Sequence, residues 1–235
     1  RENTLIVVSG DHGIPGFPRG KTNLYNLGTE VSLFAQWPGQ APAGRVVDDF
    51  VNLMDLAPTF IEAAGETPPD VMTGRSIVPL LQSKEEGSID ATRDHVITGR
   101  ERHVAAAREG NLPYPQRAIR TKDYLYIRNF APDRWPEGMP NGLENPEFSI
   151  PHEELQENTF TAYADIDAGP TKAWMIEHRN DPQWKEDFEL GFGKRPEEEL
   201  YDLNKDPDYM HNVAGEPEYE PIRAELWKRL LDTLT

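Results

Sequence analysis

The sequence predicts an α/β domain followed by a smaller α+β subdomain that combines an antiparallel sheet with a terminal helix. Residues 4–9 form a short, continuous, β-branched run, which is typical of a strand buried on both faces of a parallel sheet. Residues 31–37 predict a second buried strand. Residues 55–64 predict a helix, with Asp55 as its cap and Gly65 just past its end. Strand, loop, strand and helix in this order favour the α/β class.

The pattern changes after about residue 90. Residues 95–98, 118–129 and 199–203 predict strands of the second part. A helix is predicted from about Pro221, because six apolar residues fall on one stripe at a spacing of 3.6: Ile222, Leu226, Trp227, Leu230, Leu231 and Leu234.

Between these elements, residues 135–158 are dense in Pro, Gly and Glu and predict a long irregular excursion. We therefore expect two parts, residues 1–90 as the α/β part and residues 91–235 as the α+β subdomain. Because the first residue is Arg and a strand pattern follows almost at once, we expect the chain to begin in the middle of a domain.

The composition excludes several classes of protein. The 235 residues hold 24 Lys and Arg against 41 Asp and Glu, a net charge of −17, which repels nucleic-acid phosphates. No apolar run approaches the length of a membrane span, and the absence of Cys rules out disulfides and thiolate chemistry. Residues 100–134 are locally basic, which indicates either an anion-binding surface or a strand edge guarded by cations.

The residues that carry chemistry begin at the end of the first predicted strand, where open α/β sheets bind ligands. Asp11 and His12 offer two metal ligands or an acid–base pair, and Gly13 lets the backbone turn sharply. Arg19 and Lys21 follow on the same glycine-rich loop. Metal ligands followed by cations suit a substrate with a tetrahedral anionic centre. The alternative is a solvated turn after a strand.

A second candidate group is Arg100, Arg102 and His103, directly after a predicted strand. Arginine suits bidentate recognition of sulfate or carboxylate, and a histidine can donate to a sugar hydroxyl or titrate near neutrality. We expect these three residues to contact substrate. The alternative is a surface cluster of ion pairs around Glu101.

Several short motifs, in their order and spacing, resemble the C-terminal half of the sulfatase catalytic domain in the alkaline-phosphatase superfamily. Within that family, the pattern Gly-Ile-Pro at 13–15 and Thr-Asn-Leu-Tyr at 22–25 is most similar to the N-sulfoglucosamine sulfohydrolase (heparan N-sulfatase) branch. The resemblance covers nearly the whole chain and is weakest at 132–198. The other matching stretches are residues 9–13, 20–21, 28–29, 55–59, 64–65, 73–76, 120–124, 199–203, 206–207 and Asn212.

The resemblance implies a fold, a cofactor and roles for particular residues. The fold would be the C-terminal part of an alkaline-phosphatase-like sandwich. Asp11 and His12 would bind one divalent cation, usually calcium, and Lys21 would hold a sulfate oxygen. His12 stands where many members have Asn, and because calcium prefers oxygen ligands, manganese or another transition metal is the alternative. Arg19 has no matching role and is predicted to lie on the loop surface.

The resemblance also implies a nucleophile that this chain does not supply. The family makes a formylglycine from Cys or Ser in a Cys/Ser-x-Pro/Ala-x-Arg motif. The chain has no Cys, and Ser149, which alone has Pro two positions later, is followed by Glu153 where Arg is required. We expect the nucleophile in an N-terminal half of the catalytic domain, and expect this chain to be inactive without it.

Three functions stay open from the sequence. The first is a metal-dependent hydrolase of sulfate esters or sulfamates on sulfated saccharides, with no nucleic-acid partner. The second is a phosphonate monoester or phosphodiester hydrolase of the same superfamily. The third is a fragment that binds an anion or glycan without catalysis. By the family resemblance, the compartment would be periplasmic, secreted or lysosome-like.

Overall fold

The computed structural model describes residues 3–234, which fold into two compact units. The first unit contains residues up to Asp11 together with Val31–Val96. The second contains His12–Glu30 and the chain from Ile97 onward. The chain therefore crosses between units at three points, whereas the sequence predicted one boundary near residue 90. The loop 12–30 packs with the second unit because its side chains meet the sheet of that unit.

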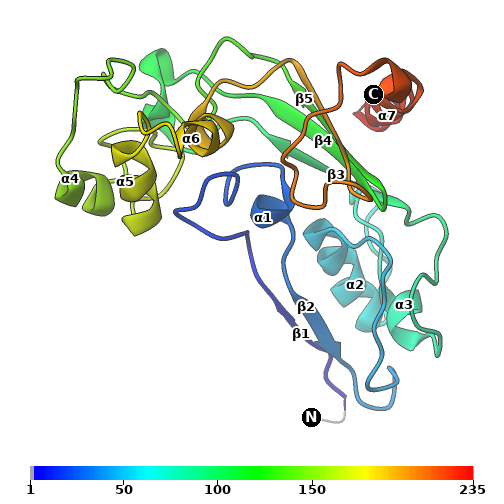
Figure 1. The fold of residues 1–235 in the computed structure, drawn as a ribbon. Coiled ribbons are helices and arrows are strands. Elements are labelled where there is room, and N and C mark those ends of the chain that lie inside the picture. The colour runs from blue at the N-terminus through cyan, green and yellow to red at the C-terminus, as the bar shows by residue number, and fades with distance from the viewer. Residues whose placement is uncertain (1–2, 235) are drawn as a thin grey trace. The chain divides into compact units, whose positions relative to one another are not determined.

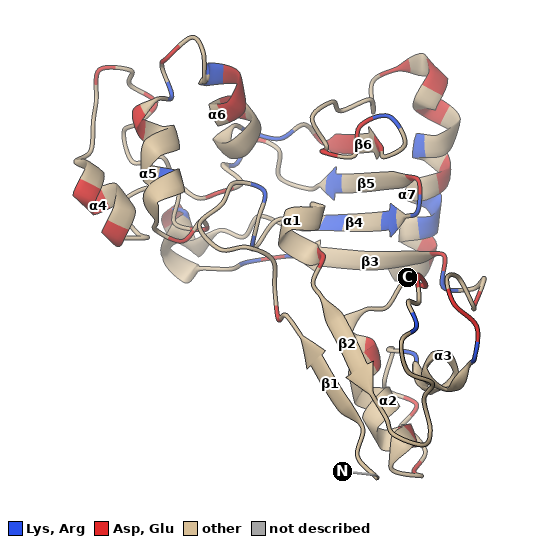
Figure 2. Ribbon diagram, turned by 60° about the horizontal axis from the view of Figure 1, so that its bottom comes forward, with Lys and Arg blue, Asp and Glu red and all other residues tan. Residues whose placement is uncertain are grey.

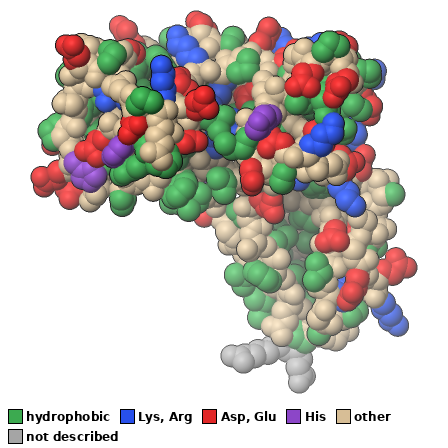
Figure 3. Space-filling view, in the orientation of Figure 1, with side chains coloured by type: hydrophobic (Ala, Val, Ile, Leu, Met, Phe, Trp, Pro, Cys, Tyr) green, Lys and Arg blue, Asp and Glu red, His purple; other side chains and the backbone are tan. Residues whose placement is uncertain are grey.

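The first unit is built on a two-stranded antiparallel ladder, β1 (Ile6–Ser9) and β2 (Leu33–Gln36), in which Ile6 pairs with Gln36. The prediction that β1 is buried on both faces of a parallel sheet is wrong for this chain. Val8 is 60% exposed and Phe34 67% exposed, and apolar side chains are visible on the surface (Figure 3). The apolar run is a strand signal, but two strands of four residues cannot cover both of their own faces.

Two helices complete this unit, α2 (Leu56–Ala63), which follows the 3₁₀ turn Leu53–Asp55, and α3 (Val78–Gln82). The sequence predicted Asp55 as the cap of α2, but its side chain makes no capping hydrogen bond to this helix. Its carboxylate is buried and binds Arg93 at 2.9 Å and the backbone N–H of Arg75 at 2.7 Å. Gly65 follows α2 at φ +85°, the left-handed conformation expected past a helix end.

The second unit is organised by a four-stranded sheet in the order β3-β4-β5-β6, seen side by side in Figure 2. Its strands are β3 (His95–Arg100), β4 (Gln116–Thr121), β5 (Tyr124–Asn129) and β6 (Glu198–Asp202). β4 and β5 form an antiparallel hairpin, and β6 pairs antiparallel with β5. The predicted antiparallel sheet and terminal helix are confirmed, and with them the mixed α/β class.

The terminal helix α7 (Glu220–Leu234) follows the 3₁₀ turn Pro217–Tyr219 and packs on the sheet (Figure 1). Leu226 and Leu230 are buried there, with Ile222 and Trp227 packed beside them. The end of the predicted stripe is wrong, because Leu231 and Leu234 are 38% and 46% exposed. The apolar stripe of α7 is wider than the face that contacts the sheet, so the leucines at its edge are exposed to solvent.

Three helices that the sequence pattern did not reveal lie between β5 and β6, one of them inside the predicted irregular excursion 135–158 and two beyond it. They are α4 (His152–Glu157), α5 (Pro170–Glu177) and α6 (Lys185–Phe192). They enclose a core of nine buried residues: Leu143, Leu155, Ala162, Tyr163, Ile166, Ala173, Ile176, Phe188 and Phe192. The signal is hidden because α5 turns Lys172 inward and α6 turns Gly191 inward, so neither helix shows a clean apolar stripe.

The remaining short elements are α1 (Asn26–Thr29) and the 3₁₀ turns Ala105–Ala107 and Glu109–Asn111. None of the helices among residues 3–234 combines the length and the apolar character that a membrane crossing requires.

Candidate functional site

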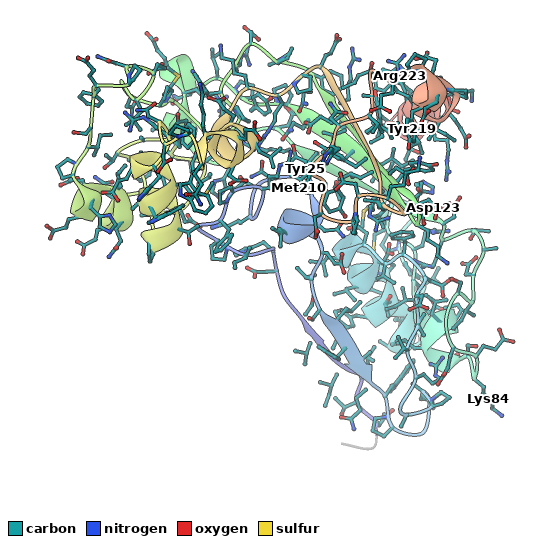
Figure 4. All side chains as sticks on the ribbon, in the orientation of Figure 1. Tyr25, Lys84, Asp123, Met210, Tyr219 and Arg223 are labelled. Atoms are coloured by element: carbon teal, nitrogen blue, oxygen red, sulfur yellow. The ribbon has the colours of Figure 1, made fainter. Side chains whose placement is uncertain are left out.

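The loop that carries Lys21 is fixed to the sheet of the second unit from both sides. On one side, the buried Arg19 donates to the hydroxyl of Tyr201 at 3.2 Å and to the backbone oxygen of Tyr209. On the other, Tyr25 donates to Glu199 at 2.6 Å and packs on the sheet (Figure 4). The prediction that Arg19 lies on the loop surface is therefore wrong. The guanidinium of Arg19 also lies 4.3 Å from the ring centre of Tyr25, and this cation–π contact joins two parts of the same loop.

The backbone around Lys21 is strained. Arg19 has φ +58° and Thr22 has φ +80°, a left-handed conformation that is an outlier for a β-branched residue. Such residues cost on the order of 1–3 kcal/mol each and persist where the surroundings fix them, often at functional sites. The hydroxyl of Thr22 donates to the backbone oxygen of Asp165 at 3.3 Å. The backbone on both sides of Lys21 is therefore fixed by contacts with residues outside the loop.

The side chain of Lys21 lies partly buried and pairs with Asp167 at 2.9 Å. This is the one hydrogen bond that its ammonium makes within residues 3–234, so two of its three N–H donors remain for a ligand. Lys21 is 25% exposed and Asp167 33%, which leaves the pair within reach of solvent.

His103 lies in the same electrostatic environment. Burial lowers the pKa of its imidazole first. The Asp165 carboxylate opposes that shift, the Lys21 ammonium adds to it, Asp167 opposes it and the Arg100 guanidinium adds to it. The net direction is downward, so the ring is neutral at pH 7 and offers one donor and one acceptor. Its Nδ1 faces the carboxylate of Asp165 at 3.6 Å.

Of the three predicted substrate contacts, His103 and Arg102 are at the surface and Arg100 is inside. The Arg100 side chain is 4% exposed and binds Asp165 at 2.7 Å. Glu101 pairs with Arg117, so part of this stretch is the ion-pair cluster that the sequence left open. Lys21 and His103 are thus brought together, 82 positions apart in the chain, and Arg100 supports them from beneath.

The locally basic stretch does not form one large cationic surface. Arg100 and Arg108 are buried against Asp165, and Arg117 and Arg128 pair with Glu101 and Glu197. Carboxylates of the same unit neutralise most of the guanidinium charge of this stretch. The geometry therefore favours Lys21 and its surroundings as the anion site.

Asp11 and His12 follow the end of β1 and are both exposed. No cluster of three or more His, Asp or Glu side chains suited to a metal occurs among residues 3–234, so these two residues supply at most part of a coordination sphere. The Nδ1 of His12 lies 2.8 Å from the backbone oxygen of Gly13. When Nδ1 donates there, Nε2 carries the lone pair that a metal binds, the arrangement usual for metal-ligating histidines. The donor pair fits a divalent cation.

The backbone bends at Gly13, as predicted, and the residue has a packing role as well. Its φ is not left-handed, but a Cβ added there would come within 1.8 Å of the backbone oxygen of Leu27. Its N–H donates to the oxygen of Gly28 at 3.1 Å. Glycine is therefore needed after His12, because Gly13 approaches the backbone of Leu27 and Gly28 closely. This contact fixes the path of the loop that follows β1.

Asp165 and Asp167 were not singled out in the sequence. They lie beyond the predicted excursion 135–158, in a stretch to which the sequence assigned no element, where isolated carboxylates give no signal of function. The one local clue is that an apolar residue, Ile166, separates them and is buried in the core of α4–α6.

Comparisons with known proteins identify the family of the chain. A family model described as "N-sulphoglucosamine sulphohydrolase, C-terminal" matches residues 10–137. The chain is 30% identical over 232 residues to an ulvan-active sulfatase of Formosa agariphila, covering 97% of this chain and 36% of that protein. It is 27% identical over 242 residues to the human N-sulphoglucosamine sulphohydrolase, covering 99% and 41%.

Among solved structures, the chain resembles a protein in complex with its substrate D-glucosamine-2-N,6-O-disulfate. The TM-score is 0.62 at 21% identity, over 99% of this chain and 34% of that one, and at that identity the likeness concerns the fold. In each of these comparisons the chain spans about a third to two-fifths of the other protein's length.

Proposed function

The chain belongs to the N-sulphoglucosamine sulphohydrolase family of sulfatases, matching its C-terminal part, and on that premise we propose that the complete protein hydrolyses sulfate groups on sulfated saccharides. The observation that carries the proposal is that Lys21 and His103 lie against the two ends of one short stretch of the chain, Lys21 at 2.9 Å from Asp167 and His103 at 3.6 Å from Asp165. An ammonium with spare donors beside a neutral imidazole suits an anionic group attached to a sugar.

Each residue has a proposed role in that reaction. Lys21 binds a sulfate oxygen and offsets the charge that develops as the bond to the leaving group breaks. His103 contacts the saccharide through its neutral imidazole, which can form a hydrogen bond with a sugar hydroxyl. Arg102 lies exposed at the same loop and can bind a second anionic group of the sugar. Because Arg100 is buried, we assign it to the support of Asp165 and not to direct substrate contact.

The metal site is proposed on the chemistry of its donors. Asp11 and His12 would hold a divalent cation, calcium or, because of the imidazole, manganese or another transition metal. Such a cation polarises sulfate oxygens and lowers the pKa of a nucleophile. Further ligands and the formylglycine nucleophile are expected from the N-terminal half, and a compartment outside the cytoplasm stays a prediction of the family resemblance.

The test is sulfate release from N-sulfated and O-sulfated glucosamine and from an aryl sulfate, with phosphonate monoesters and phosphodiesters as competitors. We expect turnover by the complete protein, with the sulfated sugar preferred, and none by the 235-residue chain alone. Preference for the phosphonate would favour the second hydrolase hypothesis. Turnover well above background by this chain alone would contradict the assignment of its nucleophile to another segment.

A further inference from the structure

The stretch Asp165-Ile166-Asp167, hereafter the 165–167 segment, lies behind the candidate site and belongs to none of the predicted motifs. We propose that Asp167 is a positioning residue that aims the Lys21 ammonium, and that the 165–167 segment is the rigid base from which it acts. The proposal rests on the function proposed above for Lys21.

The base of the segment is Asp165, whose side chain is fully buried. Two guanidinium groups, those of Arg100 and Arg108, each donate to its Oδ2 at 2.7 Å. Its Oδ1 accepts the backbone N–H of Val104 at 3.2 Å. A carboxylate bound by three donors from two other parts of the chain has little freedom to move.

The middle of the segment is held by the core. Ile166 is buried among the residues of α4–α6. Its backbone oxygen accepts from the ammonium of Lys172 at 2.9 Å, and that same ammonium donates to the backbone oxygens of Thr159 and Tyr163 at 3.1 and 3.2 Å. One buried cation on α5 therefore fixes the loop that leads into the 165–167 segment.

The segment meets the loop that carries Lys21 twice, once at each of its ends. Asp167 pairs with Lys21 at 2.9 Å, and the backbone oxygen of Asp165 accepts from the strained Thr22. Adjacent residues of the loop are thus bound by the two ends of one short segment. A flexible lysine is held in one geometry only where its head group has a fixed partner, and Asp167 provides it.

The same arrangement explains why a carboxylate can stand beside an anion site. Because Asp167 takes one N–H of Lys21, the ammonium points its remaining donors away from it. The Nδ1 of His103 lies 3.6 Å from the carboxylate of Asp165. The two carboxylates of the 165–167 segment thus each lie against one group of the candidate site.

The first experiment measures the mobility of the lysine directly, by NMR order parameters of the Lys21 ammonium in the 235-residue chain. Asp167→Ala is expected to lower the order of Lys21 to that of a solvated lysine, whereas Asp167→Asn, which keeps an acceptor, is expected to retain most of it. The matched control is Asp232→Ala, which breaks the exposed pair of Lys228 with Asp232 and leaves Lys21 unchanged. Unaltered order of Lys21 in Asp167→Ala would overturn the proposal.

The second experiment measures kcat/KM of the complete protein in a double-mutant cycle of Lys21→Ala and Asp167→Ala. Asp167→Ala alone is expected to reduce kcat/KM about tenfold or more, with Asp167→Asn restoring most of it, and the double variant is expected to equal Lys21→Ala. Additive effects would contradict a role through Lys21.

The two experiments separate the two proposals. If Lys21→Ala leaves hydrolysis unchanged while Asp167→Ala frees the lysine, the positioning holds and the proposed function fails. If Lys21→Ala abolishes hydrolysis and Asp167→Ala changes neither mobility nor rate, the function holds and the positioning fails. Asp165 is left intact in both, because its removal leaves two buried guanidiniums uncompensated and is expected to unfold the unit.

Discussion

At the scale of single residues, the site depends on charges that act on one another over short distances. Lys21, His103 and Asp167 come from three distant parts of the chain, and the charges of Lys21 and Asp167 both act on the pKa of His103. Asp11 and His12 are neighbours in sequence, so their spacing along the chain does not depend on the fold. This difference sets what can be tested by substitution.

Replacing Lys21 is expected to change the titration of His103. Burial is the first cause that lowers the imidazole pKa, and the Lys21 ammonium lowers it further. Lys21→Met therefore raises the pKa of His103, and Asp167→Asn lowers it, since that carboxylate opposes the shift. An NMR titration of the histidines measures both changes. Lys194→Met is the control, and equal curves for His103 in all variants would contradict the proximity of the two groups.

Replacing Asp11 is expected to weaken metal binding by the complete protein. Asp11→Asn removes a negative ligand from the donor pair, and the affinity for a divalent cation should fall on the order of tenfold, since ligand charge tunes it. Metal content after dialysis, measured beside Asp70→Asn at another exposed carboxylate, reports the change. Equal metal content in both variants would remove Asp11 from the ligand set.

At the scale of elements, the sequence predicted those whose apolar side chains repeat regularly. The strand β6 and the helix α7 were predicted within a few residues, whereas the one strand predicted at 118–129 is two, β4 and β5, joined by a turn. Alternate residues of these strands pack into two different cores, so both faces of the sheet are covered. The helices α5 and α6 were missed, because Lys172 and Gly191 face inward where an apolar residue would mark the stripe. The burial of β1 was predicted wrongly, because an apolar run indicates a strand but not which elements cover its faces.

The packing of α7 is testable at two adjacent leucines. Leu230 is fully buried against the sheet, whereas Leu231 is 38% exposed. Leu230→Ala should cost about 2–5 kcal/mol of unfolding free energy, and Leu231→Ala less than about 1 kcal/mol. Urea unfolding of the two variants and the parent chain provides the comparison. Equal losses would mean that the helix faces the sheet differently.

The buried ammonium of α5 gives a prediction about pH. Burial lowers the pKa of Lys172 to about 8 from a reference of 10.5 in the unfolded chain. Between these values the unfolded state binds more protons, so the stability that this group contributes rises with pH from 8 to 10.5 and is smallest below 8. Lys172→Met leaves three carbonyls without a donor and should destabilise by about 1–3 kcal/mol.

The gap between the parent chain and Lys172→Met is therefore expected to widen as the pH rises through that window. Urea unfolding at pH 7 and pH 10 measures it, with Lys185→Met at an exposed lysine as the control. A gap that narrows with pH would show that the ammonium is stabilised by its carbonyls more than burial opposes it.

At the scale of the whole molecule, sequence reasoning reached the family and half of the site. Asp11, His12 and Lys21 stand in motifs whose spacing can be recognised, and the family is confirmed over residues 10–137. Asp165 and Asp167 could not be predicted, because their role depends on which residues the fold places opposite them. The same is true of Arg100, whose guanidinium proved to be a buried support.

The most direct measurement is the rate of sulfate release from N-sulfated glucosamine by the complete protein with and without Lys21. Removal of a preorganised donor to developing negative charge costs about 10²–10³ in kcat, so Lys21→Ala should lose that much, whereas Lys194→Ala, at an exposed lysine outside the site, should retain the parental rate. A Lys21→Ala protein that releases sulfate as fast as the parent would contradict the assignment of the anion site to this loop.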